Sequence, residues 1–348
     1  MIYMPYLLSQ WAEEHCLQRA HDIFPRDGIV IPIIEPMTHS WFKSSKGIAA
    51  WTRAGRTALL IVNPYQKEFA RRPGVVSYSA IRESGLLKTT HIDGDTLIPT
   101  LLIHAGTTLE SVKMVLAKQA VRAVVHRSPL DPVSLSALLS DCHILFHVFD
   151  VDTTNDAYRA QFAGQAKTIL LQNAFVKAPK NLLYSEAASC LHHLPFRCKA
   201  AKADGISDLL IETGHRVDTR GGSPTICAMH IGFTLDAKLE VWMQHFVGSS
   251  TTSADKPPEA TLLAVEGAEA DDRDDRMRYG DSFLLAAEKL RLLKLENPNI
   301  WLDSHGVALL LSALSRNKEL IPRDVKEYSF LHYLEVMHRL CAVRVDVR

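Results

Sequence analysis

The sequence contains no apolar run long enough to cross a bilayer, and its N-terminal segment, MIYMPYLLSQWAEEH, has neither the basic start nor the small-residue cleavage site of a signal peptide. It also has no surplus of charge, because 39 Lys and Arg residues balance 39 Asp and Glu residues. This balance argues against a non-specific nucleic-acid binder, which requires a basic surface. Together these absences predict a cytoplasmic protein without a membrane segment.

Paired cysteine motifs are lacking as well. The six cysteines are scattered without a CxxC pair, which predicts reduced, mostly buried thiols. The tightest group of zinc-type ligands, SCLHHLPFRC (189–198), fits no familiar zinc-finger spacing, so a helix end is the preferred interpretation. RGGSP (220–224) is interpreted as a flexible turn, with an anion-binding nest as the alternative. DDRDDRMR (271–278) is interpreted as a solvated charge cluster.

Apolar, strand-like runs alternate with helix-like segments, a pattern typical of parallel α/β sheets. Arg127, Asp150 and Asn173, at the ends of three successive runs, follow one another at intervals of 23 residues. This regularity favours a single closed (β/α)8 barrel of the TIM type over an open sheet. The eight predicted strands are 29–34, 57–62, 97–103, 121–126, 143–149, 167–172, 206–211 and 226–233.

The rest of the chain is expected to extend the barrel. IGFTLDAKLEVWMQHFVG (231–248) predicts a β-hairpin after the eighth strand, so that the barrel domain would occupy residues 1–250. Residues 251–279 are rich in Ser, Thr, Pro and charge, which predicts a mobile linker. An apolar stripe at helical spacing in FLHYLEVMHRLC (330–341) predicts that C-terminal helices, over 280–348, pack on the barrel.

Several of the apolar runs end in a polar side chain. GIVIPIIEP stops at Glu35, TALLIVNP at Asn63 and LIPTLLIH at His104. In a parallel barrel, polar side chains at the carboxyl ends of the strands build the ligand site. The same argument applied to the later strands completes the predicted site: Glu35, His104, Asp150 and His230 as catalytic residues, and Asn63, Arg127, Asn173 and Asp208 as ligand-binding residues.

The chemistry of these residue types suits an anionic ligand. The guanidinium of Arg127 can grip phosphate or carboxylate with two hydrogen bonds. Burial is expected to raise the pKa of Glu35 towards neutrality, which would let it exchange protons with a phosphoester, with or without a divalent metal. The alternative for each residue is a cap or a turn, since strand ends are followed by polar loops. His143 and His147, which alternate in one strand, are predicted to be core histidines.

Six short motifs, YMPYL, VIPIIEP, IVNP, GISD, GGSPTICAMHIGF and HFVG, occur in this order along the chain. Together they resemble the motifs of a bacterial family related to the phage beta protein group. The resemblance implies a single cytoplasmic barrel encoded in mobile or antiphage-defence gene neighbourhoods, often with a nuclease-like partner, and it adds His245 to the ligand-binding candidates. The chain departs from the family pattern at residues 8–10 and 65–67, which puts a phosphate-binding role of the N-terminal segment in doubt.

Two functions follow from the sequence. In the first, the barrel is an enzyme or sensor that binds, and hydrolyses, a phosphorylated or nucleotide-like small molecule at its mouth. In the second, the barrel is an inert scaffold whose C-terminal helices and linker bind another protein. Convergence of Glu35, His104, Asp150 and His230 would favour the first function, and a mouth plugged by the C-terminal helices would favour the second.

Overall fold

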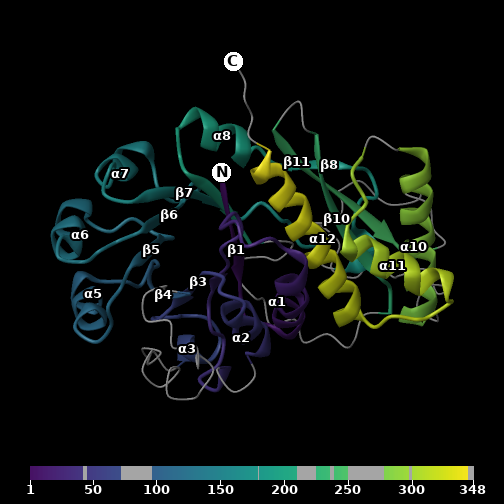
Figure 1. The fold of residues 1–348 in the computed structure, drawn as a ribbon, viewed down its shortest axis with the longest axis horizontal. Coiled ribbons are helices and arrows are strands. Elements are labelled where there is room, and N and C mark those ends of the chain that lie inside the picture. The colour runs from purple at the N-terminus through teal and green to yellow at the C-terminus, as the bar shows by residue number, and fades with distance from the viewer. Residues whose placement is uncertain are drawn as a thin grey trace, which may run out of the picture. The chain divides into compact units, whose positions relative to one another are not determined.

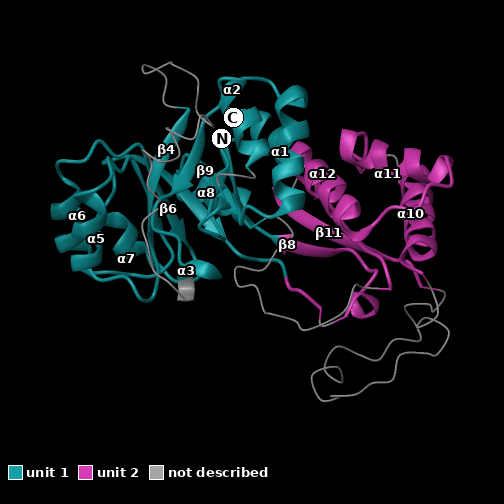
Figure 2. Ribbon diagram, turned by 90° about the horizontal axis from the view of Figure 1, so that it is seen from below, with its two compact units in different colours: residues 1–175, 192–215, 337–348 teal, residues 176–191, 216–336 magenta. Residues whose placement is uncertain are grey.

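The computed structural model describes residues 1–41, 45–71, 96–178, 180–209, 225–235, 239–249, 278–297 and 300–343. The chain forms two compact units, shown in different colours in Figure 2. Unit 1 comprises residues 1–175, 192–215 and 337–348, and unit 2 comprises residues 176–191 and 216–336. The chain thus divides differently from the predicted barrel domain over 1–250, because residues 216–250 group with unit 2.

Unit 1 contains a closed barrel of eight parallel strands with helices between them (Figure 1). Most strand residues are buried, because each parallel strand has the barrel interior on one face and helices on the other. The predicted TIM-like α/β barrel is therefore confirmed. In order around the barrel, the strands are β1 (Ile2–Leu7), β2 (Ile33–Ile34), β3 (Ala58–Ile61), β4 (Leu97–Ile103), β5 (Ala123–His126), β6 (Phe146–Asp150), β7 (Lys167–Gln172) and β9 (Gly205–Asp208).

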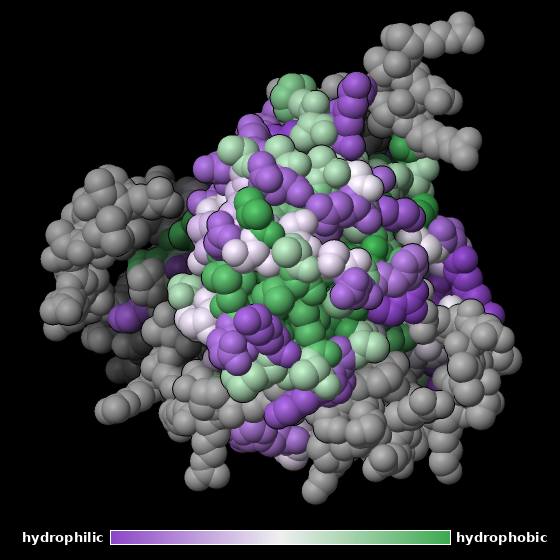
Figure 3. Space-filling model, turned by 90° about the vertical axis from the view of Figure 1, so that its left-hand side faces the viewer, coloured by the Kyte–Doolittle hydropathy of each residue, from purple (hydrophilic) through white to green (hydrophobic). Residues whose placement is uncertain are grey.

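The helices of unit 1 bury one face and leave the other exposed. On α5, for example, Val112 and Val115 are buried in a cluster with strand residues, whereas Met114 is 53% exposed. Figure 3 shows the side that carries α5, α6 and α7, where apolar side chains are interspersed with hydrophilic ones. The helices are α1 (Trp11–Ile23), α2 (Lys46–Arg53), α3 (Glu68–Arg71), α5 (Leu109–Leu116), α6 (Pro132–Leu139), α7 (Asp156–Ala160) and α8 (Leu194–Ala200).

The barrel interior is filled by alternate residues of the strands. Met4, Tyr6 and Leu8 of the first strand segment belong to one buried apolar cluster, and so do Leu59 and Ile61 of β3. Because side chains alternate between the two faces of a strand, every second residue counted from these positions points inward. This alternation decides which polar residues at the strand ends face the barrel axis.

Two of the predicted barrel strands need correction. The first barrel strand is β1, which pairs with β9 at Ile2 and Gly205 to close the barrel. The predicted first strand, 29–34, contributes only the two residues of β2 in second place. Residues 226–233 are not part of the barrel, because they belong to β10 (Ala228–Leu235) of a separate antiparallel sheet.

Unit 2 contains this three-stranded sheet, in the order β10, β11 (Glu240–Val247) and β8 (Ser189–His192), the last of which ends across the boundary with unit 1. The predicted hairpin is confirmed, since β10 and β11 pair from Ala228 with Val247 to Leu235 with Glu240. Helices α10 (Tyr279–Glu296) and α11 (His305–Ser315) share an apolar cluster with β10 and β11. They thus pack on this sheet, whereas the sequence predicted that they would pack on the barrel.

The last helix, α12 (Pro322–Ala342), runs from unit 2 into the C-terminal part of unit 1. No helix in the described part of the chain is long and apolar enough to cross a membrane. Three predictions fall on residues outside the described ranges: the linker as far as residue 277, the RGGSP motif and the charge cluster before residue 278.

Gly205 is expected to be essential for barrel closure. A Cβ atom at this position would lie 2.4 Å from the carbonyl oxygen of Ile2 and 2.8 Å from Cδ1 of Ile169. We therefore expect Gly205→Ala to lower the free energy of unfolding by roughly 1–3 kcal/mol, measured by urea denaturation. Gly164→Ala is the control. A Cβ atom at Gly164 would meet no atom within 4 Å, but the φ of this residue is +76°, so the substitution measures the effect of backbone strain alone. A loss no larger than this control would contradict the steric argument.

Candidate functional site

Six side chains gather at the carboxyl ends of β1 to β6, and we call them the mouth cluster. Four of them lie at inward positions counted by twos from the interior residues, at or directly after the ends of their strands. Tyr6 comes from within β1, and Tyr65 comes from the loop after β3. The cluster consists of Tyr6, Glu35, Tyr65, His104, Arg127 and Asp150.

Arg127 is the only cation among these six residues, and it is nearly enclosed. Its side chain is 9% exposed, and its Nε lies 3.6 Å from Oδ2 of Asp150, whose side chain is 6% exposed. The guanidinium also lies over the ring of Tyr6, with Cζ 5.7 Å from the ring centroid. Nη1 is buried, and no described residue offers it a hydrogen-bond acceptor. A buried donor of this kind is costly unless a ligand or water occupies it.

Glu35 is fully buried beside this arginine. The hydroxyl of Tyr6 donates a 2.6 Å hydrogen bond to Oε2, and the backbone N–H of Tyr65 donates a 3.2 Å bond to Oε1. Burial raises the pKa of Glu35, although these two hydrogen bonds and the charge of Arg127 oppose the rise. Glu35 therefore holds a proton more readily than an exposed glutamate does.

Asp150 and Arg127 form a buried ion pair, in which burial and the charge of the partner shift each pKa in opposite directions. Burial raises the pKa of Asp150, and the nearby charge of Arg127 opposes this rise. Burial by itself would lower the pKa of Arg127, but Tyr6, Tyr65 and the two carboxyl groups raise it on balance. The backbone N–H of Asp152 donates a 3.1 Å hydrogen bond to Oδ1 of Asp150. Arg127 consequently remains charged throughout the working pH range.

His104 and Tyr65 form an aromatic wall at the same end of the barrel. Their rings are stacked, with centroids 4.3 Å apart and planes inclined by 8°. The backbone N–H of Gly106 donates to Nδ1 of His104 at 3.2 Å, which favours the tautomer with its proton on Nε2. Burial, and to a smaller extent Arg127, lowers the pKa of His104, so this imidazole is neutral at neutral pH. It can then accept or share a proton without carrying a charge of its own.

Asn63 and Asp208 hold the strands together at the same end of the barrel. The Asn63 amide donates to the carbonyl of Leu102 at 2.7 Å and accepts from its N–H at 2.8 Å, which extends the ladder between β3 and β4. Asp208 is buried on the outward face of β9, where it accepts 2.8 Å and 3.2 Å hydrogen bonds from Tyr3 and His192. The predicted position of Asp208 in the mouth is therefore wrong.

Two further predicted residues, His230 and His245, belong to unit 2. They are direct cross-strand partners in β10 and β11, with their Nδ1 atoms 2.7 Å apart and the ring of Tyr184 against both. His230 was predicted at the barrel mouth on the assumption that 226–233 is a barrel strand, and this assumption is wrong. Asn173, the remaining predicted ligand residue, follows β7 and is half-buried.

Another histidine pair lies in the layer between the barrel and its helices. His126 and His147 point away from the axis, and their rings are joined by a 3.0 Å contact between Nε2 and Nδ1. Nδ1 of His126 also lies 3.0 Å from the hydroxyl of Tyr158. His147 is thus a core histidine as predicted, whereas His143 is exposed in the segment before β6.

Tyr6 and Tyr65 are the mouth residues that the sequence argument missed. Tyr6 lies in MIYMPYL, which was not among the predicted strands. Tyr65 follows the proline of IVNP and lies in the loop after β3, beyond the strand end to which the sequence argument was applied. Had residues 2–7 been assigned to a barrel strand, the alternation from Met4 would have placed Tyr6 in the interior.

The described residues contain no group of three His, Cys, Asp or Glu side chains that could hold a metal ion. In the SCLHHLPFRC segment, His192 bonds to Asp208, and the thiol of Cys198 lies 3.3 Å from the carbonyl oxygen of Ala203.

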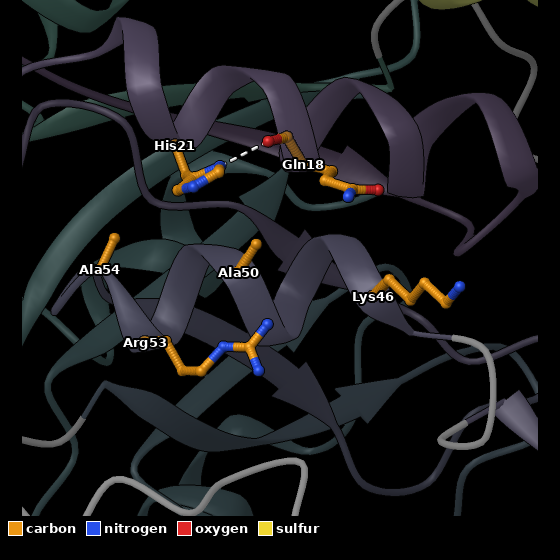
Figure 4. Close-up of a pocket in the computed structure, with 6 residues that line it drawn as sticks. All are labelled: Gln18, His21, Lys46, Ala50, Arg53 and Ala54. Carbon is orange, nitrogen blue, oxygen red and sulfur yellow. Dashed lines mark hydrogen bonds between the residues drawn. The ribbon is translucent and has the colours of Figure 1, made fainter.

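A separate surface pocket of about 620 Å³ lies between α1 and α2. Gln18 and His21 project from α1 towards α2, and Ala50 projects from α2 towards α1 (Figure 4). Lys46 and Arg53, both exposed, complete its cationic rim. This pocket shares no residue with the mouth cluster. It is therefore a second place at which an anion could bind, and an experiment on anion binding must distinguish the two.

We found no matching family model, no matching curated protein and no matching solved structure for this chain. The function must therefore be inferred from the geometry of the mouth cluster.

Proposed function

We propose that unit 1 binds a small anionic ligand of the phosphorylated or nucleotide-like class at the mouth of its barrel, and hydrolyses a phosphoester bond there. The observation that carries this proposal is the buried Nη1 of Arg127, which has no acceptor among the described residues. A purely structural arginine would be expected to use its donors within the protein. Arg127 instead keeps one donor available while Asp150 faces its Nε side.

Burial strengthens the attraction between Arg127 and an anion. In water an exposed arginine is screened, but a side chain that is 9% exposed acts through a medium of lower dielectric constant. Phosphate and carboxylate oxygens match the planar donors of a guanidinium. The half-buried Tyr65 and His104 rings beside this group could also support a flat part of the ligand.

Proton transfer is assigned to Glu35. Its raised pKa suits a general acid that donates a proton to the leaving-group oxygen of a phosphoester. His104, neutral and with a lowered pKa, suits the opposite role of accepting a proton from the attacking water. The motif resemblance supports, as part of the same proposal, a defence-associated role beside a nuclease-like protein.

Glu35→Gln tests the assignment, because the amide keeps the size of the side chain but cannot transfer a proton. We expect the hydrolysis of phenyl phosphate or diphenyl phosphate, whose leaving group needs a proton, to fall by roughly 100-fold or more, with inorganic phosphate still bound. The melting temperature should stay close to that of the unaltered chain.

The matched control is Glu13→Gln. Glu13 is also buried, and it accepts a 2.7 Å hydrogen bond from the backbone of Gln10 at the start of α1, so it should leave turnover unchanged. Full turnover in Glu35→Gln would remove Glu35 from the reaction. A chain that hydrolyses neither ester would contradict the hydrolase part of the proposal.

A further inference from the structure

The charges of the mouth cluster do not favour an anion as they stand. Arg127 supplies one positive charge, whereas Glu35 and Asp150 supply two carboxyl groups, all three of them buried. If both carboxyl groups were ionised, the cluster would carry a net negative charge and would repel the ligand. Buried charges are poorly screened by salt, so this repulsion would persist at physiological ionic strength.

The two carboxyl groups are held differently. Asp150 forms the ion pair with Arg127 and also accepts the N–H of Asp152, and both contacts favour its ionised form. Glu35 is held through neutral donors, the hydroxyl of Tyr6 and the backbone N–H groups of Tyr65 and Gln66. Because the longer bond is made to Oε1, that oxygen can take up a proton while Oε2 keeps its bond to Tyr6.

The described groups that face Glu35 come from three elements. Tyr6 approaches from β1, the backbone of Tyr65 from the segment after β3, and Arg127 from the end of β5, while the hydroxyl of Ser9 bonds to the Glu35 carbonyl. Burial raises the pKa of both tyrosines, so neither gives up its proton near neutral pH.

We propose that the mouth binds its anion together with one proton, and that Glu35 carries this proton. The inference rests on the proposed function, since it requires an anion at Arg127. Protonation of Glu35 removes the excess negative charge, and the bound anion in turn stabilises the protonated carboxyl group. Ligand binding would therefore also load the general acid that the proposed hydrolysis requires.

Sulfate is the probe for this inference, because its charge stays constant from weakly acidic to weakly basic pH. Its affinity is measured by isothermal titration calorimetry at a series of pH values, each in buffers of different ionisation enthalpy. We expect uptake of about one proton per sulfate, and an affinity that falls about tenfold per pH unit above the pKa of Glu35.

Two variants locate the proton. In Glu35→Gln, which imitates the protonated side chain, sulfate should bind with an affinity independent of pH and without proton uptake. In Asp150→Asn the proton uptake should persist. Uptake that persists in Glu35→Gln, or disappears only in Asp150→Asn, would overturn the assignment to Glu35.

The outcomes separate this inference from the proposed function. Sulfate binding without pH dependence or proton uptake would leave anion binding intact and overturn the inference alone. Absence of sulfate binding at every pH would overturn both. Should Glu35→Gln fail to fold, infrared difference spectra of the unaltered chain decide the matter, because sulfate must then produce a new protonated-carboxyl band, and its absence overturns the inference.

Discussion

Replacing Arg127 with methionine is expected to weaken sulfate binding by roughly 30-fold or more, which corresponds to about 2 kcal/mol or more. Methionine keeps an apolar side chain against the ring of Tyr6 but removes every donor and the only cation of the mouth cluster. The two neighbouring carboxyl groups would then face an anion without compensation. Equilibrium titration of the purified variant measures the effect.

Arg53→Met is the control for this experiment, because Arg53 lines the other cationic pocket, between α1 and α2. It should leave the affinity for sulfate unchanged. If Arg53→Met abolishes binding and Arg127→Met does not, the anion site lies in that pocket and the assignment to the barrel mouth is wrong.

Removal of Arg127 should also change stability in a way that identifies its partner. Without the cation, the carboxylate of Asp150 is left buried and uncompensated, an arrangement that generally destabilises proteins. Adding Asp150→Asn to Arg127→Met should recover part of that loss, since the buried charge is then gone. Additive losses in the double variant would show that the two residues do not form an energetically coupled pair.

Much of the mouth was predictable because apolar strands run directly into polar residues. β2, β4 and β5 are followed immediately by Glu35, His104 and Arg127, and the alternation of side chains then turns all three inward. The same rule failed for Asp208, because the position of a residue at the end of a strand does not determine whether its side chain points into the barrel or away from it. A difference of one position reverses the direction of a side chain, and the register of β9 turns Asp208 outward.

The strand that closes the barrel could not be chosen from local pattern alone. Residues 226–233 are apolar enough for a barrel strand, but most of them belong to 228–235, which pair with residues 240–247 because a hairpin brings the partner close in sequence. Residues 2–7 contain Pro5, which lacks an N–H, and yet they form β1. Long-range pairing with Gly205, rather than composition, decides between them.

The start of α5 shows how a local hydrogen bond shifts a helix start. The spacing of Thr107 and Glu110 is typical of a capping box, but in the structure Thr108 and Ser111 form it. The hydroxyl of Thr107 accepts the N–H of His104 instead. The residue that ends the fourth strand thus takes the first available acceptor, and the helix begins one residue later.

Acidification is expected to destabilise unit 1 through the pair formed by His126 and His147. Burial lowers the pKa of His147 from 6.5 to about 4 and that of His126 well below its ordinary value, so both imidazoles are neutral in the folded chain. The unfolded chain binds protons as the pH falls below 6.5, whereas the folded chain does not bind them at His147 until about pH 4. Stability is therefore complete above the unfolded pKa and is lost progressively as the pH falls from about 6.5 to about 4, by on the order of 3 kcal/mol for His147.

His147→Asn isolates this contribution, because the asparagine amide can take the place of Nδ1 opposite His126 but does not titrate. We expect urea denaturation at pH values between these limits to show a shallower loss of stability in His147→Asn than in the unaltered chain, even if the variant is less stable at neutral pH. His143→Asn, at an exposed histidine before β6, controls for the substitution itself, and the buried histidines that do not contact His147 contribute equally to all three chains. An unchanged pH dependence in His147→Asn would show that His147 is not the group whose protonation unfolds the barrel.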